Sequence, residues 1–377
     1  MNNDSLKVRF RPEVASFPAY RQGAGLKRAG FKLSSNESPW QPLPAILKAV
    51  QETDTFNRYA NPQLPELRDK LAAKFAVAGD QIQFGAGSVA ILYQLIHAVA
   101  GPGDNYICAE PSFEAYPLLG LASGAAQFGV PLTADARLNL PAMSRSINAN
   151  TRAVILCSPN NPTGPVITET EFLEFMAAVP EHVLVVLDEA YAEFVRKADA
   201  VDGMKHLAAF PNLVVLRTFA KAQGIAGLRL GYGFADAGIW RAAAATAIPL
   251  SVSTVAEVAG IAALSDEAQT QMRGRVQLIV NRREALLDGV RALGFNPPDA
   301  QGNFIWLSNV EISRVGPKVF GDPGAKLAES FRQVDILVRH IPGRGVRITV
   351  GEAESVDAVL NALKDYLAQH AGEGKDD

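Results

Sequence analysis

The chain has 377 residues and a net charge of −3, with 48% hydrophobic and 20% charged residues. This length allows one large domain and a smaller one, and the interspersed charges exclude a basic face for nucleic acid or a polybasic membrane patch. No apolar run reaches the ~18 residues of a membrane span, and the polar N-terminus does not resemble a secretory signal. We therefore expect a cytoplasmic protein that binds neither nucleic acid nor a membrane.

The two cysteines, Cys108 and Cys157, each lie in an apolar, strand-like run. Buried, reduced thiols are the ordinary state of such residues in a cytosolic protein. Two cysteines and five scattered histidines do not offer the ligand spacing of a zinc site, so no metal is expected.

Between residues 81 and 235, short apolar runs alternate with helix-length segments. Several runs lack period-2 alternation, as strands covered on both faces do, so we predict an α/β fold with a mainly parallel sheet between helices. In the helical segment 168–180, either Thr168 or Thr170 is suited to be the N-cap. The predicted strands are 81–85, 105–111, 125–132, 152–159, 182–191, 212–219 and 228–235.

After residue 236 the pattern changes to that of an α+β domain. Residues 266–295 read as a long amphipathic helix that can bridge two domains, and the Gly- and Pro-containing segment 320–326 reads as a loop. The other elements predicted here are strands within 303–309 and 336–351 and a final helix over 355–370.

Polar groups stand at the ends of several predicted strands. Asn160 and Asn161 follow one apolar strand, Asp188 ends the next, and Lys221 follows "NLVVLRTFA". The Gly-rich turn "FGAGSVA" (84–90) precedes a predicted helix. If these strands are parallel neighbours, all four groups meet at the edge where sheets of this kind bind ligands.

Each group alone also has a structural explanation. Asp188 can cap a helix, "NNPTG" can be a plain turn, and Lys221 can extend to solvent. In combination they match the needs of an aldehyde cofactor with a pyridine ring and a phosphate. A lysine beside an apolar wall has a lowered pKa and can form a Schiff base, and a buried aspartate can keep the ring nitrogen protonated.

The remaining needs of pyridoxal phosphate are met nearby. A helix N-terminus and an arginine can bind the phosphate, and Phe113 or Tyr116 of "EPSFEAYP" can stack on the ring. The segments "SPNNPTG", "LDEAY", "TFAKAQGIAGLRLGY" and "GVRITVG", in this order, resemble the fold-type-I pyridoxal-phosphate aminotransferases. More narrowly, the chain resembles the histidinol-phosphate aminotransferase group and its aromatic (phenylalanine) branch, from residue 10 to the last helix.

The resemblance implies a mixed seven-stranded sheet in a large cofactor-binding domain, 36–265. A small α+β domain, 266–377, would follow it, and an N-terminal arm, 1–35, would join the small domain. It also implies that Lys221 is the Schiff-base lysine and moves the proton between the substrate Cα and the cofactor. Asp188 would pair with the pyridine nitrogen.

The resemblance assigns the other cofactor contacts as well. Asn161 and Tyr191 would hold the ring oxygen, Phe113 would stack on the ring, and Thr218 would be near the phosphate. Tyr59 of "NRYANPQ" would reach the phosphate of a neighbouring subunit, which implies a homodimer. The backbone amides of the Gly-rich turn and one arginine would bind the phosphate: Gly87, Ser88, Val89 and Arg229.

One position departs from the family pattern. Ala220 stands where a phosphate-binding serine usually precedes the lysine, and Thr218 or Ser88 can replace that contact. A single neutral hydrogen bond contributes only ~1 kcal/mol, so the cofactor assignment does not depend on it.

For the substrate, Arg347 resembles the arginine that binds the α-carboxylate, and Asn36 and Tyr20 would face the substrate. "SFEAYP" and "GSVAILYQL" resemble the aromatic branch, so we predict ping-pong transfer between an aromatic amino acid and 2-oxoglutarate. Histidinol phosphate is the alternative donor, for which Arg339 or Arg344 could bind the phosphate. A lyase or racemase reaction also stays open.

An NAD-dependent dehydrogenase is a more distant alternative. Residues 85–90 contain G-x-G-x-x-A after a strand and before a helix, and Glu110 lies about 20 residues further on, as in the dinucleotide fingerprint. That interpretation leaves Asp188, the "NNPTG" segment and Lys221 without roles.

Overall fold

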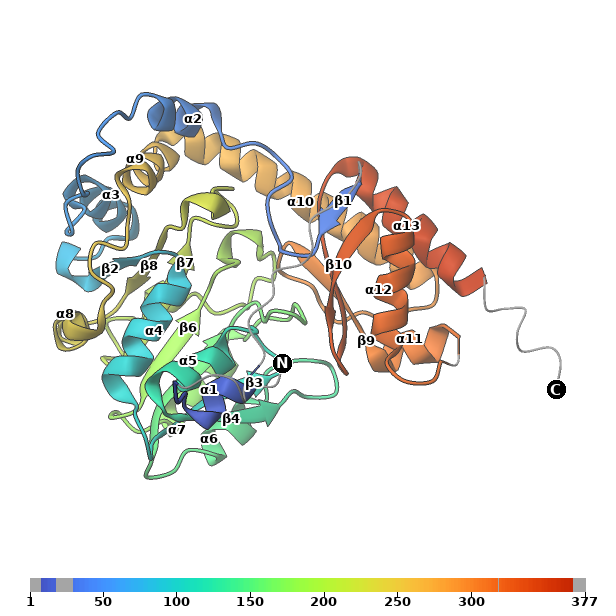
Figure 1. Cartoon of the computed structure of the whole chain (residues 1–377), viewed down its shortest axis with the longest axis horizontal. Coiled ribbons are helices and arrows are strands. Elements are labelled where there is room, and N and C mark those ends of the chain that lie inside the picture. Colours follow the sequence, from blue (N-terminus) through green and yellow to red (C-terminus); the bar gives the residue numbers. More distant parts are fainter. Residues whose placement is uncertain (1–7, 18–29, 318, 369–377) are drawn as a thin grey trace.

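The structure is a computed structural model that describes residues 8–17, 30–317 and 319–368. Its larger sheet has seven strands in the order β2-β8-β7-β6-β5-β3-β4, which confirms the predicted mixed, mainly parallel sheet (Figure 1). All the strands predicted between residues 81 and 235 are present. They are β2 (Ile82–Gly85), β3 (Asn105–Glu110), β4 (Ala126–Pro131), β5 (Thr151–Cys157), β6 (Leu184–Asp188), β7 (Leu213–Thr218) and β8 (Gly231–Phe234).

Strands β4, β3, β5, β6 and β7 are parallel neighbours. Strand β8 is antiparallel to both β7 and β2, so β2 runs in the same direction as β7. The turn after β2 therefore lies at the same edge of the sheet as the carboxyl ends of β5, β6 and β7. This is the edge at which the sequence predicted that the polar groups meet.

The sheet is buried on both faces because alternate residues of its central strands belong to different cores. Val185 and Leu187 of β6 pack in one cluster, whereas Leu184 and Val186 pack in a second cluster with α4 and α5. This explains why the central strands have continuous apolar sequences. Both cysteines are buried and unpaired, as predicted.

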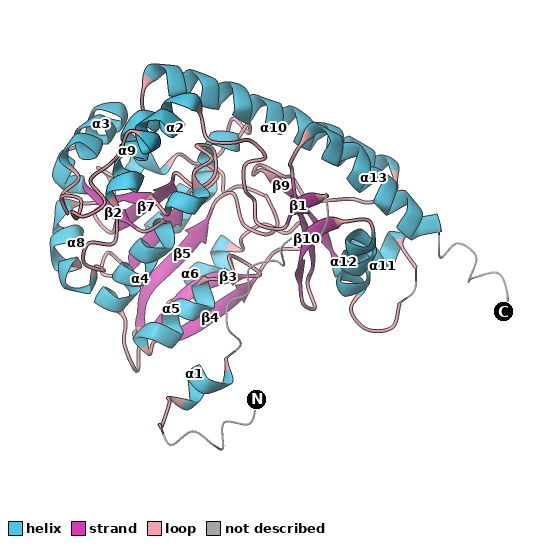
Figure 2. Ribbon diagram, turned by 45° about the horizontal axis from the view of Figure 1, so that its top comes forward, coloured by secondary structure: helices cyan, strands magenta, loops and turns pink. Residues whose placement is uncertain are grey.

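Helices cover both faces of the larger sheet (Figure 2). Thr168, rather than Thr170, caps α7 in a capping box with Glu171. The helices of this part are α2 (Pro44–Gln51), α3 (Pro65–Phe75), α4 (Ser88–Val99), α5 (Tyr116–Ser123), α6 (Leu140–Arg145), α7 (Glu169–Ala178), α8 (Ala237–Ala242) and α9 (Thr254–Ala263), preceded by α1 (Pro12–Ser16). Short 3₁₀ helices lie at Gly79–Gln81, Ala192–Phe194, Gly203–His206, Ala226–Leu228 and Ala244–Thr246.

The second sheet has four strands in the order β1-β10-β11-β9 and lies beside the first (Figure 1). The predicted strands and final helix of this part are confirmed. The elements are β1 (Phe31–Leu33), β9 (Phe304–Ser308), α11 (Asn309–Val315), α12 (Pro323–Gln333), β10 (Ile336–Ile341), β11 (Gly345–Thr349) and α13 (Ala353–Ala368).

The predicted loop over 320–326 is wrong in its second half. Helix α12 begins at Pro323, and the Asp322 carboxylate caps it by accepting hydrogen bonds from the amides of Gly324 and Ala325. Proline suits the first helical position because the amide that it lacks would have no helical partner there. The Asp-Pro pair was therefore a helix start.

Strand β1 pairs in parallel with β10, so a segment before the first large-sheet strand belongs to the small sheet. This pairing is consistent with an N-terminal arm that joins the small domain. The proposed limits of the domains stay a prediction. Among the residues that the structure describes, none of the helices is long and apolar enough to cross a membrane.

Helix α10 (Asp266–Ala292) connects the two parts, as predicted for residues 266–295 (Figure 2). Its 27 residues extend about 40 Å. Arg283 lies in the second half of this helix and is 0% exposed. Its guanidinium donates to the carbonyl oxygens of Phe194, at 3.2 Å, and Gly302, at 3.0 Å. The Arg283 side chain thus joins the helix to a segment that precedes it in the sequence and to one that follows it.

We predict that Arg283→Met lowers the free energy of unfolding by about 3 kcal/mol, because it leaves two buried carbonyl groups without their charged donor. Urea denaturation measures this change. Arg273→Met is the matched control, since Arg273 lies on the same helix but is exposed and donates to Thr270. Equal losses in the two variants would contradict the role given to Arg283.

Candidate active site between the two sheets

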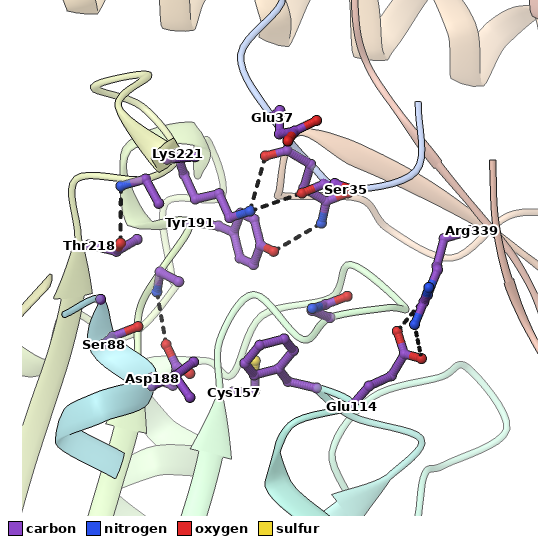
Figure 3. Close-up of a pocket in the computed structure, with 18 of the residues that line it drawn as sticks. Ser35, Glu37, Ser88, Glu114, Cys157, Asp188, Tyr191, Thr218, Lys221 and Arg339 are labelled. Atoms are coloured by element: carbon purple, nitrogen blue, oxygen red, sulfur yellow. Dashed lines mark hydrogen bonds and ion pairs between the residues drawn. The ribbon is translucent and has the colours of Figure 1, made fainter. Parts of the chain in front are cut away.

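A cavity of about 510 Å³ lies between the carboxyl edge of the large sheet and the small sheet (Figure 3). Most residues that the sequence singled out line it. They are Asn36, Gly87, Ser88, Val89, Phe113, Asn161, Asp188, Tyr191, Thr218, Lys221, Arg229 and Arg347. The structure therefore brings together residues from both ends of the chain, while the roles assigned to them stay predictions.

Neighbouring strands bring the central groups to the same level. Cys157 of β5 is in register with Asp188 of β6, which is in register with Leu216 of β7. The chain then leaves β5 toward Asn161 and β7 toward Lys221. Strand pairing thus explains how residues up to sixty positions apart along the sequence reach one cavity.

Lys221 is held by the backbone of the segment after β1. Its Nζ donates to the carbonyl oxygens of Ser35, at 3.2 Å, and Asn36, at 3.1 Å. Burial, together with the positive charge of Arg347, lowers the pKa of Lys221 to about 7. A substantial fraction of this amine is therefore unprotonated, and nucleophilic, near neutral pH.

Asp188 is 4% exposed and accepts two hydrogen bonds. The Tyr116 hydroxyl donates to its Oδ2 at 3.0 Å, and the amide of Ala190 donates to its Oδ1 at 3.2 Å. Burial raises the pKa of Asp188 to about 6. Since the carboxylate is costly to bury, a cationic group bound in the cavity would be stabilised beside it.

The two aromatic residues offered by "EPSFEAYP" have different positions. Phe113 lines the cavity, whereas Tyr116 is 1% exposed and donates its hydroxyl hydrogen bond to Asp188. The two rings pack edge to face with centroids 5.5 Å apart. Phe113 is therefore the residue that can stack on a bound ring.

Asn36 has a left-handed backbone, with φ of 53°. Its side chain is fixed on both sides, because Nδ2 donates to the Tyr191 hydroxyl at 2.9 Å and Oδ1 accepts from Thr349 at 3.0 Å. Asparagine tolerates this backbone conformation better than most residues. Burial raises the pKa of Tyr191, so its hydroxyl stays protonated and can donate a hydrogen bond.

Arg347 of β11 is 5% exposed and donates hydrogen bonds to two neighbouring oxygens. Its Nη1 donates to Asn161 Oδ1 at 2.5 Å and its Nη2 to the carbonyl of Ser34 at 2.6 Å. These two hydrogen bonds orient the guanidinium toward the cavity that it lines. Asn161 Oδ1 is engaged in this way, so its amide nitrogen is the group that can donate to a ligand.

The Gly-rich turn forms a close-fitting cradle at the start of α4. Gly87 has φ of 80° and no side chain caps the helix, so the first amides face the cavity edge. A Cβ at Gly87 would clash with the Arg229 guanidinium, and one at Gly231 would clash with the Ser88 amide. The glycines thus allow an arginine and a helix N-terminus to approach each other closely, which suits an anion.

Thr218 lies close to Ala220, the position at which the sequence departs from the family pattern. Thr218 also lines the cavity, and its Oγ1 accepts a hydrogen bond from the Ala220 amide at 3.0 Å. Its hydroxyl proton points in turn toward the carbonyl of Leu230, at 3.4 Å. Thr218 and Ser88 both remain candidates for the contact that a serine at position 220 would make.

Three predictions lie outside this cluster. Tyr59 does not line the cavity and is 81% exposed, which leaves its ring available to another molecule. Tyr20 is outside the described residues. Asn160 is structural, since it is 0% exposed and bonded to Ser112, at 2.7 Å, and Thr163, at 2.8 Å.

Sequence reasoning missed two acidic residues that line the cavity, Glu37 and Glu114. Glu37 forms an ion pair with Lys32 at 2.8 Å. The Glu114 carboxylate accepts hydrogen bonds from Nε and Nη2 of Arg339. Glu114 directly follows Phe113, and that adjacency was the available signal, but a glutamate in a loop is usually solvated.

Residues 28–363 match the family of class I and II aminotransferases. The chain belongs to this family. The membership confirms the prediction of an aminotransferase. It also agrees with the position of β2, an edge strand separated from β3 by four others, because a dinucleotide-binding unit needs these two strands in one parallel βαβ unit.

The dehydrogenase alternative is therefore wrong. Its acidic residue, Glu110, instead forms an ion pair with Arg344 at 2.6 Å, and neither residue lines the cavity.

Similar proteins span nearly the whole chain. An aromatic amino acid aminotransferase of Streptomyces coelicolor is 40% identical over 362 residues, which cover 95% of this chain and 97% of that protein. The protein of the same name from Corynebacterium jeikeium is 41% identical over 365 residues, covering 95% and 94%.

Solved structures show the same fold. The histidinol-phosphate aminotransferase of Sinorhizobium meliloti, in complex with pyridoxal-5'-phosphate, superimposes with a TM-score of 0.85 at 24% identity and covers 97% of this chain and 99% of that chain. The aspartate aminotransferase of Thermus thermophilus with maleate superimposes with a TM-score of 0.78 at 22% identity, covering 90% and 92%. This likeness supports the fold-type-I architecture.

The lowered pKa of Lys221 predicts a pH dependence of stability. In cofactor-free protein, the folded state binds fewer protons than the unfolded state between about pH 7 and the ordinary lysine pKa of 10.5. The free energy of unfolding therefore rises with pH across this window, by on the order of 1.4 kcal/mol for each unit of pKa shift.

Lys221→Met should abolish this component of the slope in urea denaturation series from pH 7 to 10. Lys205→Met, which replaces an exposed lysine, should retain the slope of the wild-type protein. Parallel curves for the wild-type protein and Lys221→Met would show that the amine is not desolvated.

Proposed function

We propose that this chain is a pyridoxal-phosphate-dependent aminotransferase that moves an amino group between an aromatic amino acid and 2-oxoglutarate. The observation that carries the proposal is a lysine amine with a pKa near 7 in a cavity that also presents a buried carboxylate and an anion cradle. Relatives about 40% identical over nearly the full length and named aromatic amino acid aminotransferases support the choice of substrate.

The residues of the cavity fit the cofactor. The cradle at Gly87, Ser88 and Val89 would hold the phosphate, with Arg229 as its counter-charge and Thr218 beside it. A side chain at position 87 would fill the space between the turn and the arginine. The missing serine at position 220 therefore removes one contact from a site that keeps several others.

When bound, the cofactor supplies an aldehyde that reacts with amines and a pyridine ring that accepts electrons. Asp188 would stabilise a proton on the ring nitrogen, because ionisation of this buried carboxylate is more favourable beside a cation. Tyr191 and Asn161 would donate to the ring oxygen, and Phe113 would cover one face of the ring.

Lys221 would act through Nζ as nucleophile and as general base. The carbonyl oxygens of Ser35 and Asn36 hold Nζ at a fixed place, and its lowered pKa leaves the amine able to take a proton from the substrate Cα. A catalytic base works best when its pKa lies near the working pH, and burial provides that match here.

Arg347 would bind the α-carboxylate of the substrate. Hydrogen bonds to an amide oxygen and a carbonyl oxygen orient the guanidinium, which lines the cavity and can form a bidentate pair with an incoming carboxylate. Asn36 lines the same cavity and would face the same substrate, as would Tyr20 from the N-terminal arm. The two reactions would alternate at one site, with 2-oxoglutarate entering after the first oxo acid leaves.

Histidinol phosphate remains the alternative donor. The structures named for it are under 25% identical to this chain, which limits their support to the fold. The two arginines considered for its phosphate are both engaged, since Arg339 binds Glu114 and Arg344 binds Glu110. An aromatic donor requires neither arginine, and we therefore favour it.

The assembly that we propose is a homodimer in the cytoplasm, with active sites shared between subunits. The exposed ring of Tyr59 supports this, as does the exposed side chain of Phe56 near it in the sequence, 69% accessible. The carboxyl edge of the large sheet, in the proposed domain 36–265, would hold the cofactor. The proposed small domain, from 266 onward, would supply Arg347.

We predict that Lys221→Ala abolishes turnover, because no other residue replaces its amine, while the far-UV spectrum of the protein stays unchanged. Wild-type protein given pyridoxal phosphate should absorb in the visible, and borohydride should fix the cofactor to Lys221. Lys205→Ala is the matched control and should stay active and coloured.

Conversion of the cofactor to its amine form in a single turnover, followed with phenylalanine, tyrosine, glutamate and histidinol phosphate, tests the substrate. Phenylalanine or tyrosine should react faster than histidinol phosphate. Wild-type protein that stays colourless with pyridoxal phosphate would refute the assignment of this cofactor. Release of racemised or cleaved donor without the amine form of the cofactor would favour a racemase or a lyase.

For Tyr59, we predict that Tyr59→Phe weakens binding of pyridoxal phosphate a few-fold, the effect of about one hydrogen bond or ~1 kcal/mol. Sedimentation should show dimers of both proteins. Mixed dimers of one Lys221→Ala subunit and one Tyr59→Phe subunit check the assignment in trans. The site that keeps Lys221 then faces the intact Tyr59 of its partner and should bind the cofactor with wild-type affinity. Unaltered affinity in Tyr59→Phe would remove Tyr59 from the site.

A further inference from the structure

An ion pair closes one side of the cavity. Arg339 Nε donates to Glu114 Oε2 at 2.8 Å, and Nη2 donates to Oε1 at 2.6 Å. The side chains are only 15% and 28% exposed, and both residues line the cavity. Because the pair is bidentate and partly shielded, it is stronger than an ordinary surface ion pair.

The two partners come from different parts of the fold. Glu114 lies in the loop after β3, next to Phe113, and Arg339 lies in β10 of the small sheet. In Figure 3 the pair lies on the opposite side of the drawn residues from Ser88 and Thr218. It therefore lies away from the phosphate cradle, where the side chain of a bound substrate can reach.

Arg339 is also the direct cross-strand partner of Arg347. Side chains at paired positions of antiparallel strands lie on the same face, so the two cations are close neighbours. Arg347 donates to an amide oxygen and a carbonyl oxygen, and Arg339 donates to the Glu114 carboxylate. The cavity thus presents two neighbouring arginines, and Glu114 balances the charge of Arg339.

We propose that Glu114 is a specificity-determining residue that neutralises Arg339 and so disfavours amino donors whose side chain ends in a phosphate. This inference rests on the proposed function, since it concerns the donor of that reaction. A phosphate that approaches Arg339 must displace Glu114, and the displaced carboxylate then repels it across a partly shielded space. An uncharged aromatic side chain can pack beside the intact pair.

The side-chain carboxylate of 2-oxoglutarate would also compete with Glu114 for Arg339. It carries one negative charge, whereas a phosphate carries nearly two, so its repulsion by Glu114 is weaker. The donor half-reaction isolates the effect because the acceptor takes no part in it.

The chain offers a matched control in a second ion pair between the same two parts. Glu110, at the end of β3, binds Arg344 at 2.6 Å in the turn between β10 and β11. Its side chains are 52% and 48% exposed, and neither lines the cavity. Glu110→Gln removes the same charge and a bridge between the same segments without altering the cavity wall.

The experiment measures single-turnover kcat/KM for histidinol phosphate and for phenylalanine in holoenzyme. Glu114→Gln should raise the ratio of the first to the second by at least about tenfold, which corresponds to ~1.4 kcal/mol. Glu110→Gln should change the ratio by less than about threefold, as expected of an exposed pair. The increase in Glu114→Gln should appear mainly in KM for histidinol phosphate.

Arg339→Met tests the same idea from the other partner and should lower the ratio, because it leaves a carboxylate alone at the cavity wall. The double variant of Glu114→Gln and Arg339→Met should lose the gain of Glu114→Gln. If the double variant keeps the raised ratio, or if Glu114→Gln and Glu110→Gln have equal ratios, the role of Glu114 is refuted while the proposed function stands. Wild-type enzyme that converts neither donor overturns the proposed function, and the inference falls with it.

Discussion

Desolvation at the carboxyl edge of the large sheet is the constraint on which the site depends. Burial lowers the pKa of Lys221 and raises that of Asp188, so one cause moves both groups toward their uncharged forms. Each group is consequently more reactive, or binds an opposite charge more strongly, than it would in water. The cost is acceptable because backbone carbonyls, the Tyr116 hydroxyl and an amide satisfy the buried polar atoms.

The second constraint is that the site is completed by two sheets. The large sheet supplies Lys221, Asp188 and the Gly-rich turn with Arg229, whereas the small sheet supplies Arg339 and Arg347. Lys221 itself is held by the segment that follows β1, a strand of the small sheet. The relative position of the sheets therefore sets the geometry of the lysine, and Arg283 in α10 links the chain on both sides of that boundary.

The parts that could be predicted from sequence are those that a repeated physical pattern encodes. The strands are continuous apolar runs because both faces are covered, and Asp188 and Lys221 stand out because they interrupt such runs. The start of α12 was missed since proline and glycine indicate both loops and helix starts. Glu114 could not be separated from solvated glutamates, because its partner Arg339 is 225 residues away in the sequence.

That long-range pair also bears on how one scaffold can serve different substrates. The lysine, the carboxylate and the cradle depend on strand ends, which the core holds in place. Position 114, in contrast, lies in a loop, where substitution costs the core little. A carboxylate at position 114 balances the charge of Arg339, which β10 holds in register with Arg347, and a neutral residue there would leave that charge unbalanced by Glu114. In the function that we propose, the chemistry and the choice of substrate side chain depend on residues under different structural constraints, so the second can change without the first.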